Sequence, residues 1–485
     1  MRTIVDGLRE LATSSRTVLI DGAHRVDGAG LYGEACALAA HFSARLPRGS
    51  VVSFMLPNWS EAAVVYLGAA LAGMVVNPIL PSLRDHELSF ILADADCRMI
   101  FIPREFRGHD YAAMLARVTA AMGTPPEIVA VRDGALPAAA VPSDFPAVAP
   151  DDPALLLYTS GTSGRAKGVL HSHNSIGALI GQLRDHWLIE PGDTFLVPSP
   201  IAHIGGSIYA FECPLLLGTT AVLMERWNAD EAVALMVAER CTHVAGATPF
   251  LEQILDAAAR AGTRLPDLKV FICGGASVPS SLIRRATAYF ERAKVSRVYG
   301  STEVPVTTVG ALDDPDAAAD TDGRPAIADI RLVVGEIRVR GPQMLVGYRH
   351  PQDESRDAEG YFPTGDLGRW QGDCLVVTGR AKDIIVRNGE NIAPKEVEDI
   401  LVGHPGIAEV AIVGLPDERT GERACAVIVP SAGSPPGIAE LRSFLVAKGI
   451  ARFKVPEQVE TWDALPKNDA GKVLKHQIRA RLTCR

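Results

Sequence analysis

An apolar run that ends in a loop rich in glycine and hydroxyl groups lies at Leu155 to His171, LLLYTSGTSGRAKGVLH. The run 155–157 is short and uninterrupted, which is typical of a strand buried on both faces. The glycines after it let backbone N–H groups approach a ligand closely. Hydroxyl groups and the ammonium of Lys167 are donors that suit phosphate oxygens. The stretch therefore predicts a buried strand followed by a loop that wraps a polyphosphate.

Two other interpretations of this loop fit the sequence less well. The phosphate loop of nucleotide hydrolases, G-x-x-x-x-G-K-[ST], fails because Ala166 precedes the lysine and Gly168 follows it, where the magnesium-binding Ser or Thr should stand. A flexible Ser/Gly linker is disfavoured, since linkers are not usually fused to an apolar strand or interrupted by one lysine.

Strand and helix patterns alternate on both sides of the loop. Strands are expected at 51–56, 98–102, 195–199 and 269–273, a buried helix within 62–76, and a hairpin at 18–26 around Asp21-Gly22. Ser60 is expected to cap the helix, with Glu61 in its first turn. This alternation predicts an α/β fold with doubly wound parallel sheets, which bind ligands at the carboxyl ends of their strands.

Length and composition restrict the class of protein further. A chain of 485 residues is too long for one ordinary core and predicts at least two domains. A net charge of −9 without a basic stripe argues against nucleic-acid binding. The segment 62–76 is too short for a membrane span, and the N-terminus does not read as a signal peptide. The eight cysteines lack C-x-x-C or zinc-like spacing, so we expect reduced thiols in a cytoplasmic protein.

Two further patterns are interpreted as chance matches. Gly28, Gly30 and Gly33 match the dinucleotide fingerprint G-x-G-x-x-G, but no acidic residue follows about 20 residues later to bind a ribose. His171 and His173 suggest a metal site, yet no further ligands stand at suitable spacing. We expect the start of a capped helix there instead.

The segment 158–169, YTSGTSGRAKGV, resembles the phosphate-binding signature of the adenylate-forming enzymes: acyl-CoA synthetases, luciferases and adenylation domains of peptide synthetases. Later segments resemble further motifs of that family in the correct order, at 274–276, 299–303, 361–368 and 466–472. The resemblance implies a large N-terminal domain of doubly wound sheets at 1–379, which binds ATP and the acid. It also implies a small, mobile α+β C-terminal domain at 380–485, with a hinge near Lys382.

The resemblance also implies roles for single residues. Lys472 is expected to catalyse adenylation, Glu303 to bind magnesium, and His203 to line the channel between the acyl group and the adenylate. Tyr299 offers a ring face to the purine, and Asp366, in a tight turn, would bind the ribose diol. The residues expected to bind ATP or AMP are Thr159, Ser160, Gly161, Thr162, Ser163, Gly164, Lys167, Gly275, Ala276, Ser277, Tyr299, Gly300, Ser301, Thr302, Asp366 and Arg380.

The acid and coenzyme A would occupy neighbouring sites. The residues expected to form the acyl pocket are His203, Ile204, Gly205, Tyr209, Gly274 and Val304. They offer small or apolar surface without a buried aspartate for an ammonium, which favours a hydrophobic monocarboxylate over an amino acid. The text of the chain, especially at 56–81 and 203–206, resembles cyclohexanecarboxylate-CoA ligases and relatives that act on alicyclic or polycyclic acids. A medium-chain fatty acid or an arylalkanoate stays open as the substrate. The residues expected to contact CoA are Asn388, Gly389 and Lys454.

One position departs from the family pattern. Val386 stands where some relatives have a lysine that contacts the adenylate, which leaves one phosphate contact unassigned.

The implied reaction uses ATP, Mg²⁺ and coenzyme A to convert a small carboxylic acid into its acyl-CoA through an acyl-AMP. A homodimer is left open. One alternative is a free-standing adenylation enzyme that loads the acyl group onto a carrier protein. A non-catalytic adenylate-binding module is disfavoured, because Lys472, Glu303 and Asp366 are all present.

Overall fold

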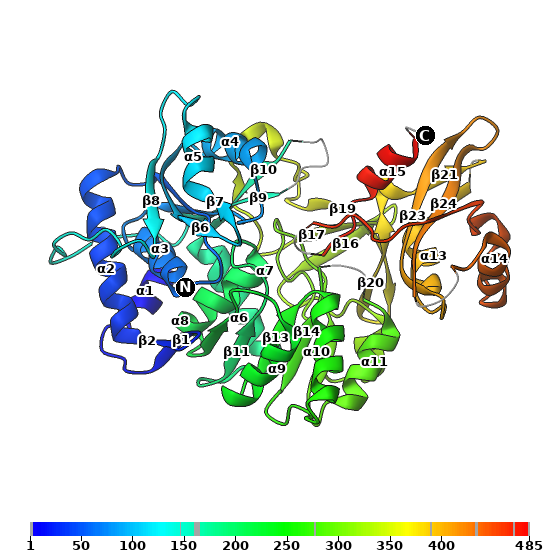
Figure 1. The fold of residues 1–485 in the computed structure, drawn as a ribbon, viewed down its shortest axis with the longest axis horizontal. Coiled ribbons are helices and arrows are strands. Elements are labelled where there is room, and N and C mark those ends of the chain that lie inside the picture. Colours follow the sequence, from blue (N-terminus) through cyan, green and yellow to red (C-terminus); the bar gives the residue numbers. More distant parts are fainter. Residues whose placement is uncertain are drawn as a thin grey trace.

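The structure, a computed structural model, describes residues 3–145, 147–159, 165–275, 278–388, 390–431, 435–468 and 471–483. Most of the chain forms a large domain with two seven-stranded sheets and a four-stranded sheet (Figure 1). The C-terminal part forms a smaller domain around a sheet of its own. The expected α/β architecture with a small α+β C-terminal domain is thus confirmed, whereas the division at 379–380 stays a prediction.

The first seven-stranded sheet has the order β15-β14-β13-β11-β12-β1-β2 and is parallel except for its edge strand β2. Its strands are β1 (Thr17–Asp21), β2 (His24–Asp27), β11 (Thr194–Val197), β12 (Thr220–Leu223), β13 (His243–Gly246), β14 (Val270–Cys273) and β15 (Lys294–Arg297). The helices packed with its outer face are α9 (Ala229–Ala238), α10 (Thr248–Arg260) and α11 (Ser280–Tyr289).

The second seven-stranded sheet has the order β18-β10-β9-β4-β3-β5-β8, with β10 and β18 antiparallel to their neighbours. Its strands are β3 (Val51–Phe54), β4 (Val75–Pro78), β5 (Cys97–Pro103), β8 (Glu127–Val131), β9 (Pro153–Thr159), β10 (Lys167–Ser172) and β18 (Gly347–Tyr348). The helices packed with its outer face are α4 (Asp85–Asp94) and α5 (Tyr111–Thr119). As predicted, the leucines of β9 are buried on both faces.

One large hydrophobic core joins the inner faces of these two sheets. The helical segments that contribute to it are α1 (Ile4–Arg9), α2 (Gly28–Arg45), α3 (Ser60–Leu71), α6 (His173–His186), the π-helix η1 (Ile208–Glu212) and α8 (Cys213–Leu216). Because α3 is buried on almost every side, its sequence is apolar all round rather than amphipathic. Within the described residues, no helix has both the length and the apolar character needed to cross a bilayer.

The four-stranded sheet is antiparallel and completes the large domain. Its strands are β16 (Asp329–Val333), β17 (Glu336–Arg340), β19 (Phe362–Gln371) and β20 (Cys374–Arg380). Other short elements of this domain are the hairpin β6 (Glu105–Phe106) and β7 (His109–Asp110), α7 (Ile204–Ser207), α12 (Pro315–Asp320) and the 3₁₀-helix η2 (Pro351–Asp353).

The chain enters the small domain through the 3₁₀-helix η3 (Ala381–Asp383). The strands of this domain are β21 (Ile385–Arg387), β22 (Glu390–Ile392), β23 (Ile407–Asp417), β24 (Gly421–Pro430) and β25 (Gln458–Thr461). Its helices are α13 (Pro394–Leu401), α14 (Ile438–Ala447), the 3₁₀-helix η4 (Arg452–Lys454) and α15 (Lys475–Thr483). Two hydrophobic clusters lie on the two faces of its central strands, which supports a domain with its own core.

Most of the local predictions outside the motifs agree with the structure, but the cap at Ser60 does not. The hairpin at 18–26 forms β1 and β2, and Ser172 caps α6 as expected. Gly28 begins α2 and Asp27 caps Gly30 N, so the glycine pattern marks an ordinary helix start. Ser60, however, does not cap α3, because Trp59 occupies the cap position and Asp21 accepts hydrogen bonds from both Ser60 N and Ser60 Oγ.

Candidate active site

The segment expected to bind the polyphosphate lies in sequence between β9 and β10, which pair antiparallel to each other, and β9 pairs parallel with β4. Thr159 pairs with Lys167, which is therefore a strand residue rather than the loop residue expected. Lys167 Nζ lies 3.7 Å from Asp353 Oδ1 and 5.2 Å from the ring centroid of Tyr348. The predicted ligands Ser160, Gly161, Thr162, Ser163 and Gly164 lie outside the described residues.

The Tyr-Gly-x-Thr-Glu segment brings Glu303 to the same place. Tyr348 Oη donates a hydrogen bond to Glu303 Oε1 at 3.3 Å, so Tyr348 contacts both the lysine of the hairpin and this carboxylate. His171 Nε2 donates to the carbonyl oxygen of Thr302 at 2.8 Å. His171 is fully buried, and burial lowers its pKa to about 4. It is therefore a neutral donor that holds the backbone at Thr302 in place.

A second cluster joins the Tyr-Gly-x-Thr-Glu segment to the four-stranded sheet. Tyr299 Oη donates to Asp366 Oδ2 at 2.8 Å, and Arg380 Nε lies 2.9 Å from Asp366 Oδ1. Asp366 and Arg380 are directly opposite each other on β19 and β20. The expected tight turn at Asp366 is wrong: the residue lies within β19, where Gly365 has φ +70° and the pairing with β17 is interrupted. This irregularity sets the carboxylate beside Tyr299.

Glycines bring three backbone segments close together beside this cluster. A Cβ on Gly274 would lie 2.9 Å from the carbonyl oxygen of Val298, and one on Gly300 would lie 2.6 Å from Val306 N. Gly275 has φ +83°, which favours glycine. Ser301 N donates to the carbonyl oxygen of Val304 at 3.1 Å, which closes the turn at 301–304. Ala276 and Ser277 are outside the part of the chain that the structure describes.

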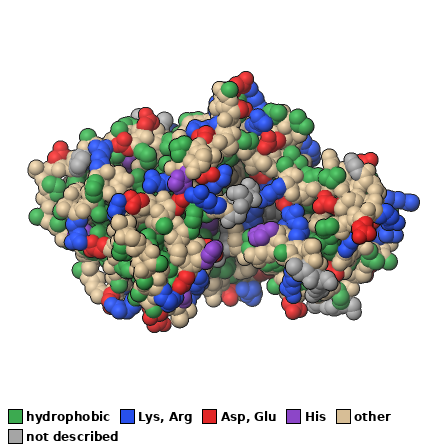
Figure 2. All heavy atoms as spheres, turned by 90° about the horizontal axis from the view of Figure 1, so that it is seen from above, with side chains coloured by type: hydrophobic (Ala, Val, Ile, Leu, Met, Phe, Trp, Pro, Cys, Tyr) green, Lys and Arg blue, Asp and Glu red, His purple; other side chains and the backbone are tan. Residues whose placement is uncertain are grey.

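Lys472 reaches this cluster from the small domain. Burial lowers the pKa of its ammonium to about 8. The positive charges of Arg380 and Lys382 contribute to this lowering of the pKa, whereas the carboxylates of Asp366 and Asp383 oppose it. The turn that carries Lys472 also faces the large domain, because a Cβ on Gly471 would lie 3.9 Å from Pro249 Cγ. Lysine and arginine side chains gather where the two domains face each other (Figure 2).

His203 directly precedes the helical segment that is expected to form one wall of the acyl pocket. It occupies the N-cap position of α7, and α7 continues into the π-helix η1. A Cβ on Gly206 would lie only 2.2 Å from the carbonyl oxygen of Pro200, so this turn requires glycine. Asn58 holds the preceding loop in place: its Nδ2 donates to the carbonyl oxygen of Ser199 at 2.9 Å, and its Oδ1 accepts from Ile201 N at 3.1 Å.

The expected pocket residues differ in exposure. Ile204 is half-buried and Gly205 is exposed, whereas Tyr209 and Val304 lie in the core. The place of all these residues in an acyl pocket stays a prediction.

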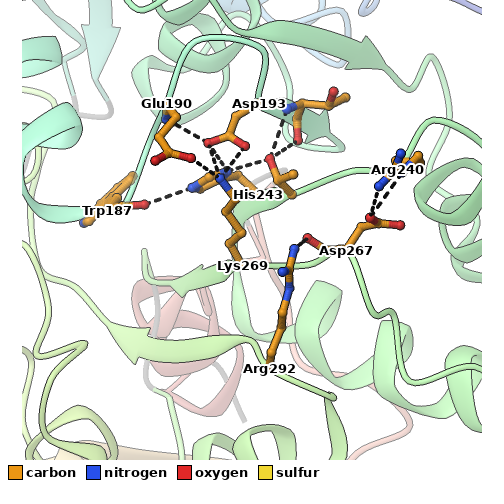
Figure 3. A network of polar contacts seen from close by, with 10 residues as sticks. Trp187, Glu190, Asp193, Arg240, His243, Asp267, Lys269 and Arg292 are labelled. Carbon is orange, nitrogen blue, oxygen red and sulfur yellow. Dashed lines mark hydrogen bonds and ion pairs between the residues drawn. The ribbon is translucent and has the colours of Figure 1, made fainter.

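Figure 3 shows a polar network that includes the buried residues His243 and Asp193, and stacked rings connect His243 to Tyr209. The ring of Tyr209 stacks on Phe195 with centroids 5.3 Å apart, and Phe195 stacks on His243 at 4.8 Å. His243 Nε2 donates to the carbonyl oxygen of Trp187 at 2.9 Å, and its Nδ1 lies 3.9 Å from Asp193 Oδ2. Burial lowers the pKa of His243, so this support is a neutral ring at neutral pH.

Glu212 is an ionisable group within the same wall. It is fully buried at the end of η1 and accepts a hydrogen bond from Tyr66 Oη. Its second carboxylate oxygen, Oε2, has no hydrogen-bond partner among the described residues. Burial raises the pKa of Glu212 to about 7.

We expect Glu212→Gln to stabilise the protein selectively at higher pH. Because the folded-state pKa of about 7 exceeds the value of 4.5 for a free side chain, the native state keeps a proton that the unfolded chain releases. The free energy of unfolding should therefore fall as pH rises from about 4.5 to 7, by on the order of 3 kcal/mol. Differential scanning fluorimetry should give nearly equal melting temperatures for wild type and variant at pH 5 and a higher one for the variant at pH 8. Equal differences at both pH values, or the same effect in the exposed control Glu252→Gln, would contradict this.

The residues expected to serve CoA and the hinge lie in the small domain. Lys382 is exposed within η3, next to Asp383, whose Oδ1 lies 2.7 Å from Arg479 Nη2. Asn388 is exposed with φ +50°. Lys454 Nζ lies 2.6 Å from Glu396 Oε2, so contact with a CoA phosphate requires that ion pair to open. Gly389 lies outside the described residues.

Two protein-family models match the chain. The model of the AMP-binding enzyme family matches residues 10–349, and the model of the AMP-binding enzyme C-terminal domain matches residues 396–472.

Individual relatives match over most of their length. A medium-chain fatty-acid–CoA ligase of Escherichia coli is 34% identical over 465 residues, which cover 89% of this chain and 81% of that protein. A 3-[(3aS,4S,7aS)-7a-methyl-1,5-dioxo-octahydro-1H-inden-4-yl]propanoyl:CoA ligase of Rhodococcus jostii is 31% identical, with 96% and 95% covered. Among solved structures, ATP-bound MatB from Rhodopseudomonas palustris superposes with a TM-score of 0.87 at 25% identity, covering 99% of both chains.

Proposed function

The chain belongs to the AMP-binding enzyme family, and from this premise we propose that it is an AMP-forming acyl-CoA synthetase for a hydrophobic carboxylic acid. The observation that supports this is the electrostatic coupling of Lys472, a residue of the small domain, to the ion pair of Asp366 and Arg380. An ammonium beside a nucleoside-binding carboxylate is suited to chemistry at an α-phosphate, where negative charge increases in the transition state.

The nucleoside of ATP would bind at the cluster around Asp366. Both oxygens of this carboxylate are already oriented by Tyr299 and Arg380, so it can accept hydrogen bonds from a ribose diol without rearrangement. Gly274, Gly275 and Gly300 support this by allowing close approach of backbone beside it. The remaining ATP-binding residues given above from the resemblance, including Ser301, Thr302 and the loop 160–164, are part of the same proposal.

The phosphates would lie between Lys167 and Glu303. Both contact Tyr348, so a cation and a carboxylate face one small region. The donor set fits Mg²⁺, which usually takes one or two protein carboxylates and completes its shell with phosphate oxygens and water. The ion, when bound to Glu303, would neutralise charge on the phosphates.

In the first half-reaction the carboxylate of the acid would attack the α-phosphate while the bond to pyrophosphate breaks. Lys472 would donate hydrogen bonds to the phosphate oxygens, and Lys167 would offset charge on the departing pyrophosphate. His203 would stand between the acyl group and the adenylate. The product is acyl-AMP, which retains the ribose contacts of Asp366 but has lost the two outer phosphates.

In the second half-reaction the small domain would rotate about Lys382 and withdraw Lys472. Asn388 and Gly389 would then line the path of the pantetheine, and Lys454 would exchange Glu396 for a CoA phosphate. The CoA thiolate attacks the acyl carbonyl, the bond to AMP breaks, and AMP leaves. The position of η3 supports this rotation. The chain passes from the large domain to the small domain through this exposed 3₁₀-helix, and each domain has its own hydrophobic core.

The acid is proposed to be bulky and apolar, with an alicyclic or polycyclic ring. Ile204, Gly205 and Gly274 would leave room for a ring, and the Rhodococcus relative is named for a bicyclic propanoate. The Escherichia relative is named for medium-chain fatty acids, which keeps that class as the alternative substrate, together with arylalkanoates.

Seven cysteines of the described chain are free and buried. This supports the proposal of a reducing compartment such as the cytoplasm. Assembly into a homodimer stays a prediction that light scattering coupled to size-exclusion chromatography would check.

The pH dependence of adenylation should follow the ammonium of Lys472. Because its pKa in the free enzyme is about 8, the active charged form is lost as pH rises through that value. We expect kcat/KM for ATP to fall by about tenfold for each pH unit well above 8. Lys472→Arg keeps its charge and should give a lower but flat profile from pH 7 to 9.5. An equally steep decline in Lys472→Arg would show that another group is responsible.

The substrate class is tested by pyrophosphate release with a panel of alicyclic, polycyclic, aromatic and fatty acids, with and without CoA. We expect the highest kcat/KM for a ring-containing acid and an acyl-CoA product by mass spectrometry. A preference for unbranched fatty acids would favour the alternative substrate class. Acyl-AMP that CoA never consumes would favour transfer to a carrier protein instead.

A further inference from the structure

Asp94, the last residue of α4, is a buried carboxylate outside the set of expected site residues; its side chain is 6% exposed. Its Oδ2 accepts a hydrogen bond from Tyr158 Oη at 2.7 Å. Its Oδ1 accepts from Arg165 Nη2 at 2.8 Å and lies 2.7 Å from His350 Nε2. Its carbonyl oxygen accepts from Arg349 Nε at 3.3 Å. One residue of α4 thus receives four contacts from outside its own helix.

These contacts come from the segments that carry the phosphate end of the site. Tyr158 immediately precedes Thr159 on β9, and Arg165 lies two residues before Lys167, so the carboxylate holds the hairpin on both sides of the loop 160–164. Arg349 and His350 directly follow Tyr348, the residue that contacts both Lys167 and Glu303. Asp94 therefore joins two segments that are about 180 residues apart in sequence.

Packing on α4 reinforces the same arrangement. The ring of Phe90 lies edge-on to Tyr158 with centroids 6.2 Å apart, and the guanidinium of Arg165 lies 5.3 Å from the Phe90 centroid. Phe90 and Asp94 are one helical turn apart, so the end of α4 offers both an apolar and an anionic contact to the hairpin.

The position of Asp94 at the C-terminus of α4 is electrostatically unfavourable for a carboxylate. A negative charge at the C-terminus of a helix opposes the helix dipole, and the last turn of α4 contains no basic residue. Burial also opposes ionisation, but hydrogen bonds from Tyr158, His350 and Arg165 outweigh it and lower the pKa of Asp94. The charge is thus stabilised by the phosphate-bearing segments, which indicates a role toward them rather than toward α4.

We propose that Asp94 is a positioning residue for the phosphates of ATP. It fixes the position of the β9–β10 hairpin relative to the segment after Tyr348, so that Lys167 and Glu303 act on the same triphosphate. This rests on the proposed function. Acyl-AMP has no β- and γ-phosphates, so Asp94 acts in adenylation and not in transfer of the acyl group to CoA.

The test separates the two half-reactions in the full-length enzyme. ATP–pyrophosphate exchange at varied ATP measures adenylation, and single-turnover reaction of synthetic acyl-AMP with CoA measures transfer. For Asp94→Asn and Asp94→Ala we expect KM for ATP to rise about tenfold or more, with transfer within about twofold of wild type. The matched control is Asp96→Asn, which removes an exposed carboxylate two residues away, paired only with Arg98 among the contacts described. It should leave both half-reactions within about twofold.

A milder variant keeps the proposal falsifiable if Asp94→Ala does not fold. Tyr158→Phe removes one hydrogen bond to the carboxylate and retains the ring beside Phe90, and it should raise KM for ATP about threefold without affecting transfer. An unchanged KM for ATP in the Asp94 variants, or a parallel loss of both half-reactions, would overturn the proposal. If the wild type exchanges pyrophosphate with none of the acids, the proposed function itself fails and the role of Asp94 falls with it.

Discussion

Lys472→Ala is expected to lower the rate of acyl-AMP formation by about 10²- to 10³-fold, the usual cost of removing one donor that stabilises transition-state charge. The charges of Arg380 and Asp366 influence the pKa of this ammonium, so the substitution removes a cation that is electrostatically coupled to the proposed nucleoside site. KM for ATP should change little in comparison, because the interaction is strongest in the transition state. Quenched-flow measurement of acyl-AMP at saturating ATP and acid would give this rate.

The matched control for this variant is Lys467→Ala. Lys467 belongs to the same terminal segment, but its Nζ lies 2.6 Å from Glu409 Oε2 within the small domain. It should retain adenylation within about threefold. Conversion of synthetic acyl-AMP to acyl-CoA should survive in Lys472→Ala, since the lysine is withdrawn at that stage. A loss of both half-reactions, or equal losses in the two lysine variants, would contradict the role of Lys472.

Asp366→Asn is expected to reduce kcat/KM for ATP by about 10²-fold. Asparagine can still accept a hydrogen bond from Tyr299, but it cannot balance the charge of Arg380 or accept both ribose hydroxyls. Two weakened charge-assisted hydrogen bonds amount to about 3 kcal/mol, which corresponds to about 10²-fold. Steady-state kinetics at varied ATP would measure the loss, with KM for the acid as internal reference.

The same sheet provides a close control for this substitution. Asp329 also accepts a hydrogen bond from a tyrosine hydroxyl, that of Tyr361, and lies 2.9 Å from Arg340 Nη2. It thus has the same two kinds of partner as Asp366, a tyrosine hydroxyl and an arginine, but it lies on β16 and its side chain is half exposed, whereas Asp366 is buried. Asp329→Asn should therefore leave kcat/KM for ATP within about threefold of wild type. Similar losses in both variants would mean that Asp366 supports the sheet rather than the ribose.

Sequence motifs were sufficient to identify residues that the fold brings together from distant segments. Tyr299, Asp366, Arg380 and Lys472 span more than 170 positions, yet hydrogen bonds, an ion pair and electrostatic coupling connect them. Each stands in a motif with a distinctive spacing of glycine, hydroxyl or charged residues. Such spacing can be recognised in a single sequence because it depends on the conformation of a short segment of backbone and not on contacts between distant segments.

Local geometry was predicted less well where tertiary pairing overrides composition. Gly365 suggested a turn at Asp366, but pairing with β20 makes the segment an irregular strand. Lys167 read as part of a glycine-rich loop, whereas its pairing with Thr159 extends β10. Helix capping at Ser60 was misjudged because Asp21, 39 positions away, provides the acceptor.

The supporting residues had no signal in the sequence. Tyr348, Asn58 and Asp94 contact the site through partners that lie 45 to 256 positions away, and no sequence pattern assigned a role to any of them. Only the packing of β18, the β3–α3 loop and α4 against the motif segments reveals them. A single chain without structure offers no pattern from which such long-range contacts follow.

The most direct test of the central claim is a two-step mass-spectrometric assay of the wild type. The enzyme, in excess over the best acid of the panel, is first mixed with ATP and Mg²⁺, and CoA is added afterwards. We predict acyl-AMP and pyrophosphate in the first step, with no ADP, and stoichiometric conversion to acyl-CoA and AMP in the second. Formation of ADP with an acyl phosphate, or of acyl-CoA without any acyl-AMP before it, would contradict the account.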